Sequence, residues 1–379
     1  MAEPFKNAFN VKMIAAMGGH LSRVDDGFDE ELFVKLASEG LEALELKQRS
    51  THIYEALVLT LPSDYPRAIE VLLASLHVYD ESGVSNADTV ENGIKGWGMM
   101  AITEYVAKCG LENDGVYFDL SLDALAEMTS RFSSEFDVRP FLLADTDRAM
   151  AHFTRWVHHA NHHVRRLASE GSRPKLPWAS QLPMFIADPM PVLPLLEALK
   201  DDSEEYVRRS VANHLNDIAK DHPDLVADIA QKWLKGASTD RTRLVRHACR
   251  TLIKQGHKGA LTAFGYGAPE IELSEFYIPD PEVQFGGALD FSVRIGSACN
   301  TEQNLMIDYI LHHRKANGKT TPKVFKWKSV KLAAGQSLVL SKSHPMKPIS
   351  TRKYYQGLHH LELQINGQVF GKIDFQLMM

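Results

Sequence analysis

The chain has 379 residues, of which 44% are hydrophobic, and a formal net charge of −6. This length and apolar content allow a large core and either two domains or one extended array with an added domain. No stretch approaches the roughly 18 apolar residues of a membrane span, and the amino terminus lacks a signal-peptide core. These features exclude a membrane protein, and we expect a cytoplasmic one whose three widely separated cysteines stay reduced.

The segment from residue 28 to about residue 265 is predicted to be helical. Apolar residues recur there at spacings of three and four, as in Ile69, Leu72, Leu73 and Leu76, which is the periodicity of one buried helix face. Prolines fall near the expected helix starts or in linkers, where a missing N–H is tolerated. We therefore expect stacked antiparallel helices.

A short pattern recurs within this segment at intervals of 43 and 37 residues: Val164-Arg165-Arg166, Val207-Arg208-Arg209 and Leu244-Val245-Arg246. Each copy is predicted to open an amphipathic helix with arginine on its polar face. The candidate N-caps are Asn161, Ser203 and either Ser238 or Thr239. Intervals near 40 residues are typical of HEAT-like repeats, so we predict an α-solenoid of HEAT-like helical repeats over residues 1–268.

After about residue 270 the hydrophobic period changes to two. Leu289, Phe291, Val293 and Ile295 alternate with polar residues, and two Asn-Gly pairs, at 317–318 and 366–367, signal hairpin turns. Roughly six or seven short strands fit an immunoglobulin-like β-sandwich over residues 284–379. Residues 268–283 are then the linker, and the predicted fold class is mainly α with this added sandwich.

Basic residues are concentrated in three runs. Residues 150–179 hold five Lys/Arg and one acid, residues 241–258 hold six and no acid, and residues 312–353 hold eleven and no acid. A basic face on an acidic body is expected of a protein that binds phosphates. Ordinary solvated charge is the alternative. We favour a nucleic-acid partner because the runs fall in successive repeats and then in the second domain.

Two carboxylates interrupt the basic stripes on the helix faces. Glu170 follows Arg166 by four residues, and Asp217 follows Arg209 by eight. A carboxylate opposes the binding of a polyanion, so we expect it to stabilise a cation, such as the oxocarbenium-like sugar formed when a glycosidic bond breaks. The alternative is that both acids pair with Arg166 and Arg209 or Arg208 on an exposed helix.

Further candidates lie near these acids. Trp178 ends a stiff basic linker, and the two prolines of this linker would hold the indole at the concave groove that stacked HEAT-like repeats form. Packing of the indole between repeats is the alternative. Glu135 is another acid ahead of the basic region. The run from His158 to His163 has zinc-like spacing, but the turn expected at Asn161 favours polar capping and backbone contacts to DNA. We predict neither a metal nor an organic cofactor.

The stretch from Val164 to Trp178, followed by the stretch from Tyr206 to Asp217, closely resembles the AlkC branch of the alkylation-repair DNA glycosylases. With the trailing sandwich, the resemblance covers essentially the whole chain. It implies HEAT-like repeats that wrap duplex DNA, and excision of cationic N3-methylated bases, chiefly 3-methyladenine and 3-methylcytosine, without full base flipping. The Trp-x-x-x-Asp helix of the related AlkD branch is absent around Trp156, because Ala160 takes the place of the acid.

The resemblance places the catalytic acids at Glu170 and Asp217, with Trp178 and Glu135 at the same site. We expect a monofunctional glycosylase that acts on alkylated duplex DNA as a monomer at the nucleoid; a non-enzymatic HEAT scaffold that binds nucleic acid or protein is the alternative. Lys326 and Lys328 are predicted to lie on one strand face and to contact phosphates; the alternative is that this face is only solubilising. The predicted DNA contacts are Arg166, Arg173, Lys175, Arg209, Asn213, Arg243, Arg246, Arg250, Lys326 and Lys328.

Overall fold

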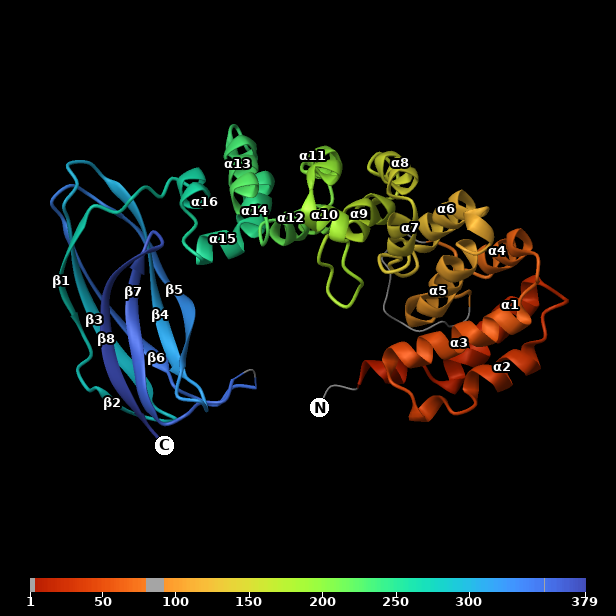
Figure 1. Ribbon diagram of the computed structural model, residues 1–379, viewed down its shortest axis with the longest axis horizontal. Helices are drawn as coiled ribbons and strands as arrows, with labels where there is room; N and C mark the ends of the chain where they lie inside the picture. The colour runs from red at the N-terminus through yellow and green to blue at the C-terminus, as the bar shows by residue number, and fades with distance from the viewer. Residues whose placement is uncertain (1–3, 80–91, 351) are drawn as a thin grey trace. The chain divides into compact units, whose positions relative to one another are not determined.

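The computed structural model describes residues 4–79, 92–350 and 352–379. The chain divides into two compact units, Met1–Ile218 and Ala219–Met379 (Figure 1). Within the described ranges, no helix combines the length and the hydrophobicity needed to cross a bilayer.

The first unit is built from short helices that pack against their neighbours along the chain, which confirms the helical periodicity (Figure 1). Its helices are α1 Val11–Val24, α2 Glu30–Ser38, α3 Leu46–Thr60, α4 Tyr65–Ala74, α5 Met99–Gly110, α6 Phe118–Met128, α7 Arg139–Ala144, α8 Thr146–Trp156, α9 His162–Gly171, α10 Pro183–Ala187, α11 Leu193–Leu199 and α12 Glu205–Ile218.

Side-chain caps fix the starts of several helices. The Asn161 side chain accepts the His163 N–H at the start of α9, and Asp145 caps α8 in the same way, as predicted for Asn161. Ser203 is not a cap, because α12 begins two residues later, at Glu205, and the Asp202 side chain accepts the Glu204 N–H at 2.9 Å. Each cap satisfies a backbone donor that has no partner inside the helix.

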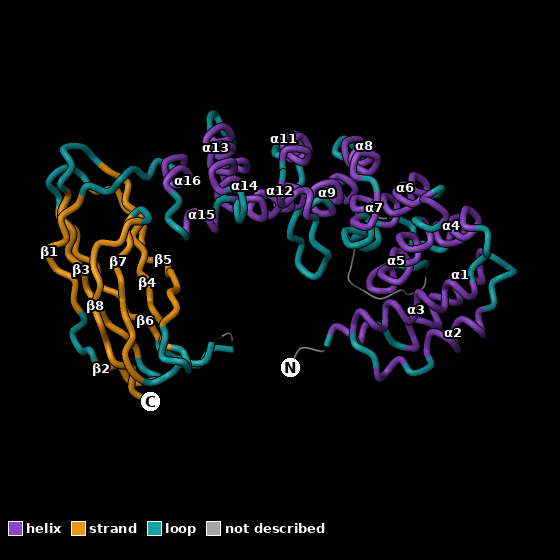
Figure 2. The backbone as a smooth tube through the Cα atoms, viewed as in Figure 1, coloured by secondary structure: helices purple, strands orange, loops and turns teal. Residues whose placement is uncertain are grey.

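The second unit combines four helical segments with two β-sheets (Figure 2). Its elements are α13 Pro223–Leu234, α14 Thr239–Ala248, α15 Arg250–Lys254, α16 Lys258–Ala263, β1 Ile271–Tyr277, β2 Glu282–Gln284, β3 Ala288–Ser297, β4 Gln303–Arg314, β5 Thr320–Leu332, β6 Ser337–Pro345, β7 Gly357–Ile365 and β8 Gln368–Met378.

The third copy of the arginine pattern differs from its prediction. Leu244, Val245 and Arg246 lie in the second half of α14, whose N-cap is Ser238, so this copy does not open its helix. The backbone leaves the helical region at Cys249 (φ −83°, ψ 5°), and α15 then begins at Arg250. The basic stripe predicted through Arg246 and Arg250 is therefore interrupted by a helix break.

The two sheets have the strand orders β1-β3-β6 and β2-β8-β7-β4-β5. Apolar side chains from alternate strand positions, among them Phe291, Tyr309 and Leu363, form the core between the sheets. The linker predicted over residues 268–283 is wrong in part, because β1 pairs antiparallel with β3 and β2 pairs with β8. The domain limits 1–268 and 284–379 otherwise stay predictions.

Both predicted hairpin turns are present. Asn366 and Gly367 join β7 to β8 with φ values of 45° and 80°, the left-handed pair that a two-residue hairpin favours. Gly256, between α15 and α16, also has a positive φ of 74°, and a Cβ placed there would lie 2.6 Å from the Gly367 Cα. Glycine at both positions thus allows the helical turn to contact the hairpin turn directly.

Candidate functional site

Helices α9 and α12 lie side by side in the first unit and carry the two predicted catalytic acids. Ser210 on α12 lies with its hydroxyl 2.9 Å from that of Ser169 on α9, and the His214 Nδ1–H donates to the Ser169 carbonyl oxygen at 2.8 Å. Burial lowers the pKa of His214 to about 4, so this imidazole is neutral. These buried polar contacts fix the two helices relative to each other.

Glu170, in the last turn of α9, is only 6% exposed. Its Oε1 accepts from Arg173 Nη1 at 2.6 Å and lies 3.5 Å from Arg166 Nη2, while its Oε2 accepts from the Ser210 hydroxyl at 2.6 Å. Burial by itself raises the pKa of Glu170, but these partners outweigh burial and hold the pKa below its ordinary value. The buried carboxylate is therefore charged at neutral pH.

Asp217, in the last turn of α12, is also buried. Its Oδ2 accepts from Arg173 Nε at 2.8 Å. Because Arg173 also contacts Glu170, this one guanidinium bridges the two carboxylates, and it is itself 7% exposed. The alternative is right that Glu170 contacts Arg166 but wrong that the two acids lie on an exposed helix face, since both are buried, and Arg209 pairs with Glu205.

Arg166 extends the network to the segment before α7. Its Nη1 pairs with Glu135 Oε2, and the same carboxylate oxygen accepts from the Ser133 hydroxyl at 2.7 Å. Glu135, Arg166, Glu170, Arg173 and Asp217 thus form one sequence of alternating charges, which we call the acid–arginine chain. Three carboxylates and two guanidinium groups give it one formal negative charge, held where solvent screens it weakly.

A pocket of about 460 Å³ opens beside the acid–arginine chain. Its polar lining includes Glu135, Arg166, Glu170 and Arg173, whereas Asp217 lies behind Arg173 and is not part of the lining. Aromatic and aliphatic side chains form the rest: Leu46, Trp97, Met100, Phe132, Phe136, Leu176, Pro177, Trp178 and Tyr206. An apolar pocket with a few convergent charged groups is the usual form of a ligand site.

Trp178 lies at the edge of this pocket in the segment between α9 and α10. It is 66% exposed and has a φ of +67°, a conformation that costs a non-glycine residue energy. Its carbonyl oxygen accepts from Lys47 Nζ at 2.6 Å. The alternative that Trp178 fills a gap between repeats is wrong, because most of the indole is exposed.

Arg139, at the start of α7, holds the segment that carries Trp178. Its side chain is fully buried, and it donates to the carbonyl oxygens of Gly171 and Arg173 at 2.9 and 2.8 Å and of Ser180 at 2.8 Å. Burial, and then the nearby Arg173, lower the pKa of Arg139 to about 10, which leaves it protonated at neutral pH. The only sign of this role in the sequence is weak: an Arg-Pro pair before an apolar run.

The structure therefore brings together Glu135, Glu170, Asp217 and Trp178, the four side chains predicted to be catalytic, although Asp217 lies one side chain away from the pocket. It also places the predicted phosphate contacts Arg166 and Arg173 inside the ion-pair network. Arg173 is buried and Arg166 is half-buried, which differs from the exposed placement expected of residues that bind a DNA backbone. Lys175 and Asn213 are half-buried and Arg209 is exposed.

In the second unit, Arg243 and Arg246 are exposed, and Arg250 is half-buried with its Nη1 donating to the His247 carbonyl oxygen. Lys326 and Lys328 are exposed, but a β-bulge interrupts the strand between them. In the register, Lys326 pairs with Asp308 and Lys328 with Ile307, and Trp327 between the two lysines packs against the core of the sandwich. That the two lysines share one face stays a prediction.

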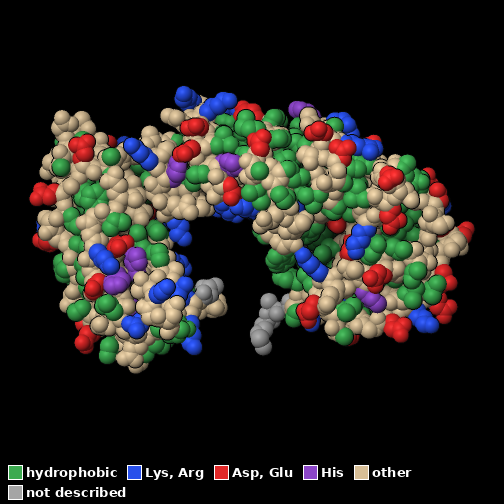
Figure 3. Space-filling model, in the orientation of Figure 1, with side chains coloured by type: hydrophobic (Ala, Val, Ile, Leu, Met, Phe, Trp, Pro, Cys, Tyr) green, Lys and Arg blue, Asp and Glu red, His purple; other side chains and the backbone are tan. Residues whose placement is uncertain are grey.

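On the face of the first unit that Figure 3 shows, exposed acidic and basic side chains are interspersed. In the histidine run, the Asn161 N–H donates to His159 Nδ1 at 3.1 Å, and the rings of His162 and His163 lie edge-on to Tyr206. The described residues contain no group of three or more His, Cys, Asp or Glu side chains placed to bind a metal ion. The contacts that the structure shows for this run are thus capping and packing contacts, and its contacts to DNA stay a prediction.

The chain is similar to known proteins both in its β-sandwich and over its whole length. Residues 272–379 match the family model described as the C-terminal Ig-like domain of the uncharacterised protein YhaZ. The chain is 36% identical to the uncharacterized protein YhaZ of Bacillus subtilis (strain 168) over 374 residues, which is 98% of this chain and 99% of that protein. The sandwich is thus an immunoglobulin-like domain, as predicted.

A solved structure is similar over the full length. It is that of Pseudomonas fluorescens alkylpurine DNA glycosylase AlkC bound to DNA containing an abasic site analog, with 35% identity, 100% of both chains covered and a TM-score of 0.84. The two sequence blocks, the helical first part, the Ig-like domain and this full-length similarity agree. The chain belongs to the AlkC branch of the alkylation-repair family.

Proposed function

We propose that the chain is a monofunctional DNA glycosylase that hydrolyses the N-glycosidic bond of cationic N3-alkylated bases, 3-methyladenine and 3-methylcytosine, in duplex DNA. The product is an abasic site. One observation carries the proposal: a buried, charged carboxylate, Glu170, faces a pocket edged by an exposed Trp178. The full-length similarity to a protein named as an alkylpurine DNA glycosylase supports it.

The chemistry follows from the charge of the lesion. An alkylated base that is already cationic leaves as a neutral molecule, so its departure needs no general acid. The sugar left behind becomes positive, and a fixed carboxylate nearby stabilises it. At about 4 Å, opposite unit charges attract by about 4 kcal/mol in a partly shielded site, which corresponds to about a thousandfold in rate.

The acid–arginine chain keeps the Glu170 carboxylate ionised. Arg166 and Arg173 hold Glu170 charged although it is buried, and Asp217 and Glu135 balance the two guanidinium groups from either side. Without those acids, the arginines would cancel the negative potential of Glu170 in the pocket. Asp217 therefore acts on the sugar cation through Arg173, and Glu170 also orients the attacking water.

We assign DNA-backbone contacts to residues outside the acid–arginine chain. Arg209, Arg243, Arg246, Lys326 and Lys328 are exposed, and Arg250, Lys175 and Asn213 are half-buried. In this proposal the HEAT-like helical repeats follow alkylated duplex DNA, and the protein works as a monomer in the bacterial cytoplasm, at the nucleoid. Arg166 and Arg173 position the carboxylates.

Release of 3-methyladenine from methylated duplex DNA tests the activity, with Asp217→Asn as the informative variant. We expect the wild-type chain to release the base and the variant to bind the same DNA with unchanged affinity while its release rate falls about 100-fold. Asp147→Asn, at an exposed acid in the first turn of α8, is the matched control and should keep the wild-type rate.

Two results would contradict the proposal. Binding of methylated DNA by the wild-type chain with no base released would favour the non-enzymatic scaffold. Unchanged turnover by a correctly folded Asp217→Asn protein would remove Asp217 from the reaction.

A further inference from the structure

Two buried polar side chains face each other on the outer side of the five-stranded sheet in the second unit. Asp308 on β4 is directly opposite Gln364 on β7 in the antiparallel register, and the two are 2% and 5% exposed. Their chain neighbours Ile307 and Leu363 lie in the core between the sheets. Since side chains alternate along a strand, Asp308 and Gln364 point away from that core.

Each of these side chains has an atom with unused hydrogen-bonding capacity. Among the described residues, neither Asp308 Oδ1 nor Gln364 Nε2 has a hydrogen-bond partner, although the Trp327 backbone N–H contacts the Asp308 carboxylate. A buried polar atom without a partner is costly, and a native protein retains few of them. An acceptor, Asp308 Oδ1, and a donor, Gln364 Nε2, thus lie on neighbouring strands, on side chains that are directly opposite each other.

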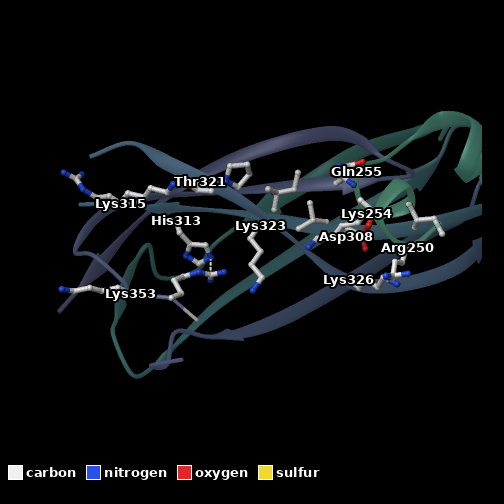
Figure 4. A pocket seen from close by; sticks show the side chains of 18 residues that line it. Arg250, Lys254, Gln255, Asp308, His313, Lys315, Thr321, Lys323, Lys326 and Lys353 are labelled. Carbon is white, nitrogen blue, oxygen red and sulfur yellow. Dashed lines mark hydrogen bonds between the residues drawn. The ribbon is translucent and has the colours of Figure 1, made fainter. Parts of the chain in front are cut away.

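Both side chains line a pocket of about 1120 Å³ whose surroundings are cationic. Lys326 on β5 lies directly opposite Asp308, and Arg250 and Lys254 reach the same pocket from α15 (Figure 4). Ile310 supplies an apolar contact next to Asp308 on the same face. A ligand that fits must therefore combine negative charge with a flat or apolar part that carries a donor next to an acceptor.

We propose that this pocket binds one unpaired nucleotide. Every nucleobase has a hydrogen-bond donor next to an acceptor on its pairing edge, which matches Asp308 Oδ1 and Gln364 Nε2 in that order. The nucleotide phosphate matches Lys326, Arg250 and Lys254. A base in duplex DNA cannot make these two hydrogen bonds to Asp308 and Gln364, because its pairing edge is already bonded to the opposite base.

The nucleotide has two possible sources with the same chemistry: an unpaired residue of a DNA strand, or a free nucleotide. The proposal goes beyond glycosylase activity and does not depend on it, since the binding is measured without any base release. A failure here leaves the glycosylase proposal untouched.

Binding of two single-stranded pentamers to the full chain tests the site. One is a thymidine pentamer, and the other has the same phosphates but no bases. We expect the pentamer with bases to bind about tenfold more tightly, as for one donor–acceptor pair. In Asp308→Asn this preference should disappear, while Asp290→Asn, at an exposed acid of β3, should keep it.

Lys326→Ala provides a second, independent readout. It should weaken the binding of both pentamers by the same factor and leave the preference for bases intact, because it removes only a phosphate contact. The melting temperature of each variant is measured first, and none of these substitutions removes a core side chain. A wild-type chain without base preference, or a preference that survives in Asp308→Asn, overturns the proposal.

Competition identifies the source. If thymidine monophosphate displaces the thymidine pentamer at a concentration where deoxyribose 5-phosphate and inorganic phosphate do not, and Asp308→Asn abolishes this, a free nucleotide fills the pocket. If only the pentamer shows the Asp308-dependent preference, the occupant is an unpaired residue of a strand. Either result supports the site.

Discussion

Trp178 has a left-handed backbone conformation, with a φ of +67°, while its indole remains 66% exposed. A non-glycine residue is disfavoured there by about 1–2 kcal/mol, and the exposed ring recovers little of that energy through burial. Lys47 and Arg139 hold the flanking backbone in place. The conformation thus serves to present the indole at the pocket rather than to stabilise the fold.

Comparing two variants of Trp178 separates the energetic cost of the left-handed backbone from the contribution of the indole to activity. Trp178→Gly should be about 1 kcal/mol more stable than Trp178→Ala, because only glycine adopts the positive φ without strain. Both variants should lose base release to the same extent, since both lack the indole. Urea denaturation and a methyladenine-release assay give the two readouts. Equal stabilities, or a higher activity in one variant than in the other, would contradict this account of Trp178.

Asp308 should give stability an unusual pH dependence. Burial raises its pKa from 3.8 to about 6, despite the opposing effects of Lys326 and the Trp327 N–H. An acid whose pKa is raised on folding stabilises the protein below its unfolded pKa, and this contribution is lost as the pH rises from about 4 to about 6. Above that range, ionised Asp308 therefore lowers the unfolding free energy of the wild-type chain by about 3 kcal/mol.

Asp308→Asn removes this titration. We expect the difference in unfolding free energy between the variant and the wild type to shift by about 2 kcal/mol in favour of the variant from pH 4 to pH 7.5, because burial of the amide lowers the stability of the variant equally at both pH values. Urea denaturation of both proteins between pH 4 and pH 8 measures the difference. A difference in unfolding free energy that stays constant over this range would show that Asp308 keeps an ordinary pKa.

At the level of elements, a side chain at the start of α7 holds the backbone of the segment between α9 and α10 in place. The Arg139 guanidinium donates to one backbone carbonyl oxygen at the end of α9 and to two in that segment, and a lysine ammonium cannot reproduce the planar arrangement. We expect Arg139→Lys to lower the unfolding free energy by about 3 kcal/mol. Trypsin should also cleave it faster after Lys175, which lies in the released segment.

Arg148→Lys is the matched control for this change. Arg148 pairs with Asp119 at the surface, where its side chain is 40% exposed, so the substitution should cost less than about 0.5 kcal/mol. Wild-type protection of Lys175 in Arg139→Lys, with stability lowered as expected, would mean that Arg139 supports the fold without holding the segment of Trp178.

Local signals in the sequence predicted the elements well. The cap at Asn161 and the turn at Asn366 and Gly367 depend on a few adjacent residues, and both are present as predicted. The bulge at Trp327 and the helix break at Cys249 were missed, because both depend on packing against residues distant in the chain. For the same reason β1 was mistaken for a linker.

For the molecule as a whole, the sequence located the acids of the site but not their partners. Spacing along one helix links Arg166 to Glu170, so that pair could be predicted. Arg173 and Asp217 meet across two helices, 44 residues apart, and only the fold shows that one guanidinium bridges both acids. Long-range contacts of this kind also explain why Arg139 and Lys47 were not recognised.

The uneven charge distribution has a related consequence. The three basic runs led to the expectation that their arginines contact phosphates, yet Arg173 is buried and Arg166 is half-buried, both beside carboxylates. A count of charges cannot distinguish a cation that binds a partner from one that holds an acid in place. The acid–arginine chain is therefore the feature on which the functional account depends.

The release of 3-methyladenine from methylated duplex DNA by Glu170→Gln tests that account most directly. The substitution keeps the shape of the side chain and removes the charge that faces the pocket, so we expect the release rate to fall by about 100- to 1000-fold while DNA affinity stays the same. Glu205→Gln, at an exposed glutamate of α12, should match the wild type. A folded Glu170→Gln protein that releases the base at the wild-type rate would contradict the central claim that this buried carboxylate stabilises the sugar cation.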